Sequence, residues 1–158
     1  MAPMYYELSS NSTTSSSAGS QSTACAAKLL TGTAVSAALK GVYAAARGGT
    51  AGGGILRVFV AGTAQSSSGS TATLQKRNSN YATAVTSAMT ATTCSQTATE
   101  RTAVGFAQTG GMGGWVAIEP DAAILLQAGG GATGNAEFST IANAASVTFD
   151  YTVELSEQ

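Results

Sequence analysis

Near its C-terminus, this 158-residue chain alternates strictly between large apolar and polar side chains. From residue 146 to 155, every odd position holds valine, phenylalanine, tyrosine or leucine, and every even position is polar or charged. A period of two places all the large side chains on one face of a β-strand, whereas a helix would scatter them around its circumference. We therefore expect an all-β protein whose last strand has one face on a core and the other in water.

Further apolar runs separated by glycine- and serine-rich segments predict about eight strands in all, which is typical of an antiparallel sandwich or barrel. Residues 35–46 are ambiguous, because their apolar residues fit both helical and strand spacing; the β surroundings favour a strand. Residues 55–60 and 71–77 are expected to form a hairpin, and residues 81–101 an extended loop with short strand fragments. The remaining expected strands are 25–30, 102–108, 115–119, 123–127 and 136–139, of which 123–127 is expected to be buried.

The first eight residues of the sequence predict either a short strand or an extended arm. Tyr5 and Tyr6 lie in a short stretch that precedes residues 9–22, a Ser/Thr-rich tract with no apolar residue larger than alanine. Such a tract is expected to be a linker. The predicted organisation is thus an arm and linker over residues 1–22 and a β-sandwich domain over residues 23–158. The arm is expected to contact a neighbouring subunit through its tyrosines, with a frayed terminus as the alternative.

Charge is scarce in this chain. Charged residues make up 9% of the sequence and the net charge is -1, against roughly 25% charged residues in an average soluble domain. A surface of this kind favours packing against other chains. It has no basic stripe, so we expect no nucleic-acid partner. No apolar run approaches the roughly 20 residues that cross a bilayer, and no N-terminal signal is evident. The sequence therefore predicts synthesis in the cytoplasm and no membrane partner.

The residues needed for common catalytic chemistry are missing. The chain has no histidine, which excludes Ser-His-Asp and Cys-His mechanisms and His-containing zinc sites. Cys25 and Cys94 are the only cysteines; they form either a disulfide or, as we favour, two buried thiols. The glycine runs at 48–54 and 110–114 lack the Lys-Ser/Thr end of a phosphate-binding loop and are expected to be turns. We expect no enzymatic activity, cofactor, metal or small-molecule substrate.

A few side chains are candidates for contacts with other subunits. Lys76, Arg77 and Arg101 are expected at strand ends or in loops, where each can form a salt bridge with an acidic neighbour. Trp115 begins a strand after the second glycine run, and a lone tryptophan there is more often a core residue than a sugar platform. With Tyr151 of the last strand, it is expected to pack in the core or in a trimer contact.

The order of these segments resembles a group of small proteins encoded in tailed-bacteriophage capsid operons. The resemblance covers roughly residues 23–155. It is carried by residues 23–28, 55–60, the Gly-Gly-Trp115 strand, the turn at residues 119–121 and residues 147–151. It implies an antiparallel jelly-roll sandwich, commonly trimeric, that binds the major capsid protein on the outer surface of the head as a decoration or cement protein.

We therefore expect a non-enzymatic virion protein at the capsid surface, made in the host cytoplasm, that stabilises contacts between capsid subunits as a homotrimer. The alternative is a carbohydrate-binding or adhesin-like β-sandwich of a phage tail or cell surface, which would use aromatics such as Tyr81 and Trp115. A shell-forming subunit is disfavoured because the chain is small for that role.

Overall fold

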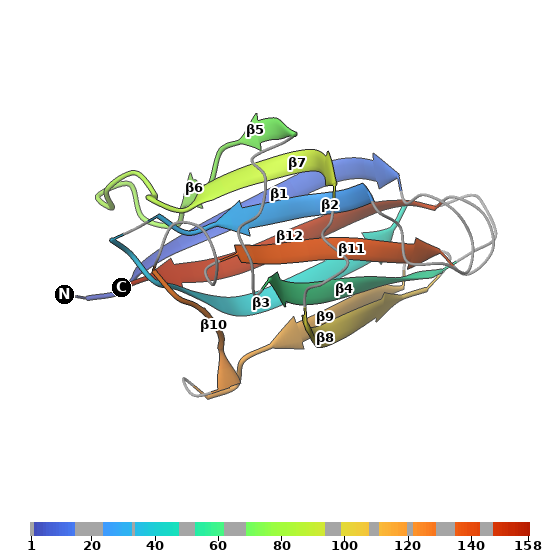
Figure 1. The fold of residues 1–158 in the computed structure, drawn as a ribbon. Coiled ribbons are helices and arrows are strands. Elements are labelled where there is room, and N and C mark those ends of the chain that lie inside the picture. The colour runs from blue at the N-terminus through green and yellow to red at the C-terminus, as the bar shows by residue number, and fades with distance from the viewer. Residues whose placement is uncertain are drawn as a thin grey trace.

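A computed structural model describes residues 2–14, 24–32, 34–47, 53–61, 69–93, 99–107, 111–119, 122–128, 135–142 and 147–158. Within these segments the chain forms strands and no α-helix, which confirms the all-β prediction. The strands lie in two antiparallel sheets that form a sandwich-like arrangement (Figure 1). Twelve strands are described, more than the sequence predicted, because several short strands extend the edges of the sheets.

The first sheet, sheet A, contains both ends of the chain. Its strand order is β10-β3-β12-β1-β6, and β9 pairs with β3 beside β10. The strands are β1 (Met4–Thr14), β3 (Ala37–Ala46), β6 (Gln75–Lys76), β9 (Met112–Val116), β10 (Ile124–Leu126) and β12 (Thr148–Glu157).

The second sheet, sheet B, faces the first. Its order is β5-β7-β2-β11-β4-β8. The strands are β2 (Ala24–Leu30), β4 (Gly54–Ala61), β5 (Ser70–Ala72), β7 (Ser87–Thr93), β8 (Thr99–Phe106) and β11 (Asn135–Ala142).

The pairing between strands is nested along the chain. β1 pairs with β12, β2 with β11, β3 with β9 and β4 with β8, all antiparallel. Successive strands β1 to β4 alternate between the sheets, so the chain follows the path of one long hairpin rolled into two layers. The strands β5, β6 and β7 fall between β4 and β8 in sequence and lie at the other edge of the two sheets.

The core lies between the sheets. Alternate side chains of β12 point into it, as the sequence alternation predicts. Phe149, Tyr151, Val153 and Leu155 are buried, while the intervening polar residues are only partly buried. The ring of Phe149 stacks on Phe106 of the facing sheet with centroids 5.0 Å apart. The hydroxyl of Tyr151 donates a hydrogen bond to a carbonyl oxygen in β2, at 3.3 Å. Tyr151 therefore joins the two layers.

Of the two alternatives for the N-terminal residues, the strand is correct and the extended arm is wrong for residues 4–14. They form β1, which pairs with β12 from Met4 opposite Glu157 to Thr14 opposite Thr148. Tyr6 and Leu8 are buried in the core. A run of small polar residues can form a strand because the ladder is made by backbone groups, and only one face needs apolar side chains. The rest of the expected linker, residues 15–22, and its boundary with the sandwich lie outside the described residues.

Other local predictions have mixed outcomes. Residues 37–46 form strand β3, as favoured. This strand pairs with β12 along one flank, and with β9 and β10 along the other flank. The expected hairpin of residues 55–60 with 71–77 is wrong. β4 lies between β11 and β8, while β5 pairs with β7 in sheet B and β6 with β1 in sheet A. In both segments, pairing with strands that are distant in the sequence determines the structure.

Two further interpretations need correction. Gly113 and Gly114 belong to strand β9, although the glycine run was expected to be a turn. Cys25 is buried and disulfide-bonded, so the favoured interpretation of reduced thiols is wrong for it. Cys94, the only other cysteine of the sequence, lies outside the described residues.

Candidate interaction surface

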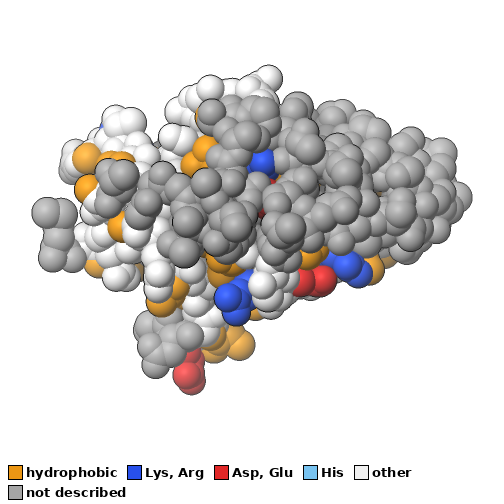
Figure 2. Space-filling model, in the orientation of Figure 1, with side chains coloured by type: hydrophobic (Ala, Val, Ile, Leu, Met, Phe, Trp, Pro, Cys, Tyr) orange, Lys and Arg blue, Asp and Glu red, His pale blue; other side chains and the backbone are white. Residues whose placement is uncertain are grey.

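Large apolar side chains are exposed along one edge of sheet A. β9 and β10 pair in succession with the same flank of β3, and the described residues between them, 117–119 and 122–123, project from the sandwich (Figure 1). The exposed fractions are 74% for Met112, 49% for Val116, 92% for Ile118 and 65% for Leu125. We call these four residues the apolar edge. Figure 2 shows hydrophobic side chains gathered around the projecting segment at the lower side of the molecule.

The direction of these side chains follows from the strand period. Trp115 and Ile124 pack against the hydrophobic core, which is one of the two roles expected for Trp115. Because successive strand residues point to opposite faces, Val116 and Leu125 must point away from that core. They lie opposite Gly41 and Ala38 of β3, so neither has a large side chain directly across the strand pair.

A cation borders the apolar edge. Arg101 of β8 is exposed and lines an open depression of about 340 Å³ together with Ala123, Ile124 and Leu125. Within the described part of the chain, no acidic group forms an ion pair with Arg101. An arginine beside exposed aliphatic side chains is a common composition for the energetic centre of a protein interface.

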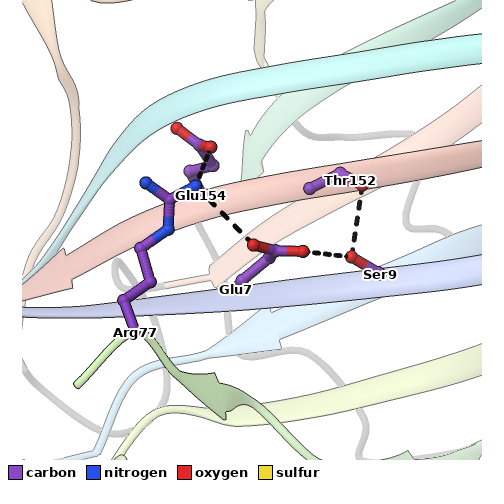
Figure 3. A network of polar contacts seen from close by, with 5 residues as sticks. All are labelled: Glu7, Ser9, Arg77, Thr152 and Glu154. Carbon is purple, nitrogen blue, oxygen red and sulfur yellow. Dashed lines mark hydrogen bonds and ion pairs between the residues drawn. The ribbon is translucent and has the colours of Figure 1, made fainter.

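Arg77, by contrast, is engaged within the molecule. Its guanidinium contacts Glu154 and lies 3.6 Å from Glu7, as Figure 3 shows. Glu7 and Glu154 lie directly opposite each other in β1 and β12, where two like charges would repel. Ser9 donates a 2.6 Å hydrogen bond to Glu7. Arg77 therefore compensates a local repulsion, and Lys76 next to it is exposed without an ion pair to any described residue.

The two N-terminal tyrosines have different environments. Tyr6 is fully buried, and its hydroxyl donates a hydrogen bond to the carbonyl oxygen of Ala82 at 3.0 Å. The ring of Tyr81 lies 6.3 Å from the ring of Tyr6. Burial, and then the nearby Glu157 carboxylate, raise the pKa of Tyr6. Tyr6 is thus a core residue and is not accessible to a neighbouring subunit, whereas Tyr5 is 39% exposed.

The structure brings four of the sequence-predicted residues together where β1 pairs with β6: Tyr6 is opposite Lys76, and the backbone N–H of Arg77 donates a 3.1 Å hydrogen bond to the carbonyl oxygen of Tyr5. Trp115 lies apart from them, in β9 at the other side of sheet A. Tyr6 and Tyr151 are in the core, Trp115 packs against it from β9, and Arg77 is on the outer face of sheet A. Sequence reasoning did not single out Ile118 or Leu125, and expected residues 123–127 to form a buried strand. The alternation is too short in the three-residue β10 to reveal which side chain is outward.

An aromatic ring lies against two glycines on the outer face of sheet A. A Cβ atom at Gly41 or Gly114 would come within 3.0 and 2.9 Å of the ring of Tyr43, so the ring covers both glycines. Beside it is an open depression of about 170 Å³ whose lining includes Met112, Asp150 and Thr152. Sequence reasoning missed this feature because Tyr43 lay in the ambiguous segment.

No helix in the described segments is long and apolar enough to span a membrane. Among the same residues, no three metal-ligating His, Cys, Asp or Glu side chains gather. No family model, curated protein or solved structure matches this chain.

Proposed function

We propose that this chain is a structural virion protein, a capsid decoration protein that binds the major capsid protein on the outer surface of a phage head. The observation that carries the proposal is the apolar edge with Arg101 beside it. Monomeric proteins rarely expose large apolar surfaces without a partner. A docked shell subunit would cover the four apolar side chains and supply an acidic group for Arg101.

The pairing pattern supports a jelly-roll fold for this protein. A jelly roll has eight strands in two sheets and contains two Greek keys. The eight strands of the nested pairs divide equally between the sheets, in the orders β1-β12-β3-β9 and β2-β11-β4-β8. Fold alone does not assign function, so the jelly-roll proposal supports the capsid assignment only together with the exposed edge and the resemblance to phage capsid proteins.

A decoration protein acts by mass action on the assembled shell. It binds where neighbouring capsid subunits meet, and its binding free energy adds to the stability of the assembled state alone. Three symmetric copies in one trimer would increase this effect through avidity. No catalytic group is needed for such a role, and few surface charges suit it because little charge must be desolvated at the contact.

The test uses heads of the encoding phage prepared without this protein. We expect saturable binding of the purified chain at a fixed copy number per head, measured by co-sedimentation and cryo-electron microscopy. The double variant Ile118→Ser/Leu125→Ser should lose at least tenfold in affinity, the equivalent of about 1.4 kcal/mol. Val85→Ser is the matched control, because Val85 is 49% exposed but outside the apolar edge. Absence of binding by the wild-type chain would contradict the proposal.

A second candidate function, carbohydrate binding, is favoured by the ring of Tyr43 on the outer face of sheet A. The ring faces an open depression, and Asp150, paired with Arg47 at 2.8 Å, offers polar groups at its border. Aromatic rings with adjacent polar groups suit a ligand that is apolar on its faces and polar at its rim. A glycan array is the test: binding that is lost in Tyr43→Ala but kept in Tyr81→Ala would favour this function over decoration.

A further inference from the structure

Three polar side chains are buried at adjoining positions of the central strands of sheet B. Lys28 of β2 is 1% exposed, and Glu137 and Asn135 of β11 are 0% and 3% exposed. The Nζ atom of Lys28 lies 3.6 Å from Oε1 of Glu137. In a chain with so few charges, a lysine and a glutamate that are both fully buried are an unusual pair.

The three residues share one face of the sheet. Ala27 and Leu29, the neighbours of Lys28, are in the hydrophobic core, as are Ala136 and Phe138, which flank Glu137. The strand period therefore directs Lys28, Asn135 and Glu137 to the opposite face of sheet B. Phe59 of β4 is opposite Glu137 and is itself buried, so the carboxylate lies between an aromatic residue and the lysine. Water has little access to this cluster.

The register brings Asn135 within reach of Lys28. Glu137 is directly opposite Lys28, and Asn135 is opposite Leu30. Asn135 and Lys28 are therefore diagonal neighbours on one face, with a separation of about 7–8 Å between their Cα atoms and less between their Cβ atoms, which long side chains span. The flexible lysine side chain can thus carry its amine to the side-chain amide of Asn135 while it remains next to Glu137.

A buried ion pair is by itself weak evidence of a stabilising role. Removing an ammonium and a carboxylate from water costs several kcal/mol for each ion, and hydrophobic replacements of a buried pair are often neutral or stabilising. The 3.6 Å separation is also long, because charge-assisted N–H···O bonds are typically about 2.7–2.9 Å. A lysine, an amide and a carboxylate in a water-poor site are instead the groups that an intramolecular condensation requires.

We propose that Lys28 and Asn135 form an isopeptide bond, with Glu137 as the proton carrier. The ammonium of Lys28 transfers a proton to Glu137, and the resulting amine attacks Cγ of Asn135. The Nζ–Cγ bond forms and the Cγ–Nδ2 bond breaks. Glu137 delivers its proton to the departing nitrogen and accepts the remaining amine proton, so ammonia leaves and no atom is oxidised or reduced. Glu137 ends as the carboxylic acid, or as the carboxylate if ammonia departs as ammonium.

The test is the intact mass of the full-length chain after reduction of its disulfide, with the N-terminal residue established. The wild-type chain should be lighter than its sequence by about 17 Da, the mass of one ammonia. After tryptic digestion, tandem mass spectrometry should find a branched peptide that joins Lys28 to Asn135. A wild-type mass equal to that of the sequence, or a loss located elsewhere, would overturn the proposal.

Three variants separate the chemistry from folding. Asn135→Ala keeps the Lys28–Glu137 pair and should show its full sequence mass. Asn135→Asp supplies a carboxyl group that condenses with loss of water, about 18 Da, so its product should have the same mass as the cross-linked wild type. Glu137→Gln removes the proton carrier and should also retain its full mass. A far-UV circular dichroism spectrum like that of the wild type confirms that each variant is folded.

Discussion

The carboxylate of Glu157 attaches the segment before β7 to the C-terminal end of β12. Glu157 is buried and accepts hydrogen bonds from the backbone N–H groups of Val85, at 3.1 Å, and Thr86, at 2.6 Å. Hydrogen bonds to a charged group each contribute about 1.5–3 kcal/mol, and a buried donor left without a partner adds a penalty. Glu157→Ala should therefore lower the free energy of unfolding by about 3 kcal/mol in urea titrations.

The control for this residue is Glu119→Ala, because Glu119 is exposed. It should leave the urea midpoint unchanged. Glu157→Gln keeps one acceptor oxygen, so its stability should lie between that of Glu157→Ala and that of Glu119→Ala. Equal stability of Glu157→Ala and the wild type would mean that segment 85–86 does not depend on this carboxylate.

Tyr151 makes the free energy of unfolding depend on pH in the alkaline range. Burial raises its pKa, and this effect exceeds the lowering by a hydrogen bond with Ser10. Above the ordinary tyrosine pKa of about 10, the unfolded chain loses this proton while the folded chain keeps it. The unfolded state then binds fewer protons, so the free energy of unfolding falls as pH rises. The contribution is fully present below pH 10 and is lost as pH rises toward the folded-state pKa.

The measurement is urea unfolding between pH 7 and 11 for the wild type and Tyr151→Phe. We expect parallel pH dependences up to about pH 9.5 and a steeper fall for the wild type above that, with a difference approaching about 1.4 kcal/mol per pH unit. Curves that stay parallel to pH 11 would show that Tyr151 loses its proton equally in both states.

At the scale of elements, β9 is held against the other sheet by a close backbone approach. A Cβ atom at Gly113 would overlap the carbonyl oxygen of Gly105 in β8, whereas one at Gly105 would meet nothing within 4 Å. Gly113→Ala should therefore displace β9 and destabilise the protein by more than about 2 kcal/mol, while Gly105→Ala should change stability by less than about 0.5 kcal/mol.

Thermal unfolding and hydrogen exchange of the β9 amides test this pair of substitutions. Both add a single methyl group to a strand glycine, so intrinsic strand preference is matched between them. Local loss of protection in β9 is expected for Gly113→Ala alone. Similar melting temperatures for the two variants would exclude the close approach as the reason for the glycine.

The sequence determined some elements and not others for a physical reason. β12 was predicted correctly because its alternation is local and strong. β1 was mistaken for an arm because serine and threonine carry no burial pattern, and its place depends on β12, more than a hundred residues away. The glycines of β9 looked like a turn because a sequence does not reveal which backbone must approach another.

The candidate surface was harder to predict than the fold. The sequence suggested the same role for Tyr5 and Tyr6. Because successive strand residues point to opposite faces, Tyr6 is buried and Tyr5 is exposed. Arg77 and Arg101 are equally polar in the sequence, yet only Arg77 lies near two opposed carboxylates. The exposure of Leu125 follows from the pairing of β10 with Ala37–Leu39 of β3, because this pairing sets the face on which Leu125 lies, and the local sequence does not encode it.

At the scale of the whole molecule, the proposed decoration function predicts a trimer whose contacts do not include the apolar edge. Multi-angle light scattering should give three times the chain mass of 15.5 kDa. If the edge is kept for the shell, Ile118→Ser/Leu125→Ser should remain trimeric while losing head binding. A trimer that dissociates in this variant would make the edge an interface between copies and would place the shell contact elsewhere. A wild-type monomer would remove avidity from the mechanism, and each head-binding site would then rest on the affinity of a single chain.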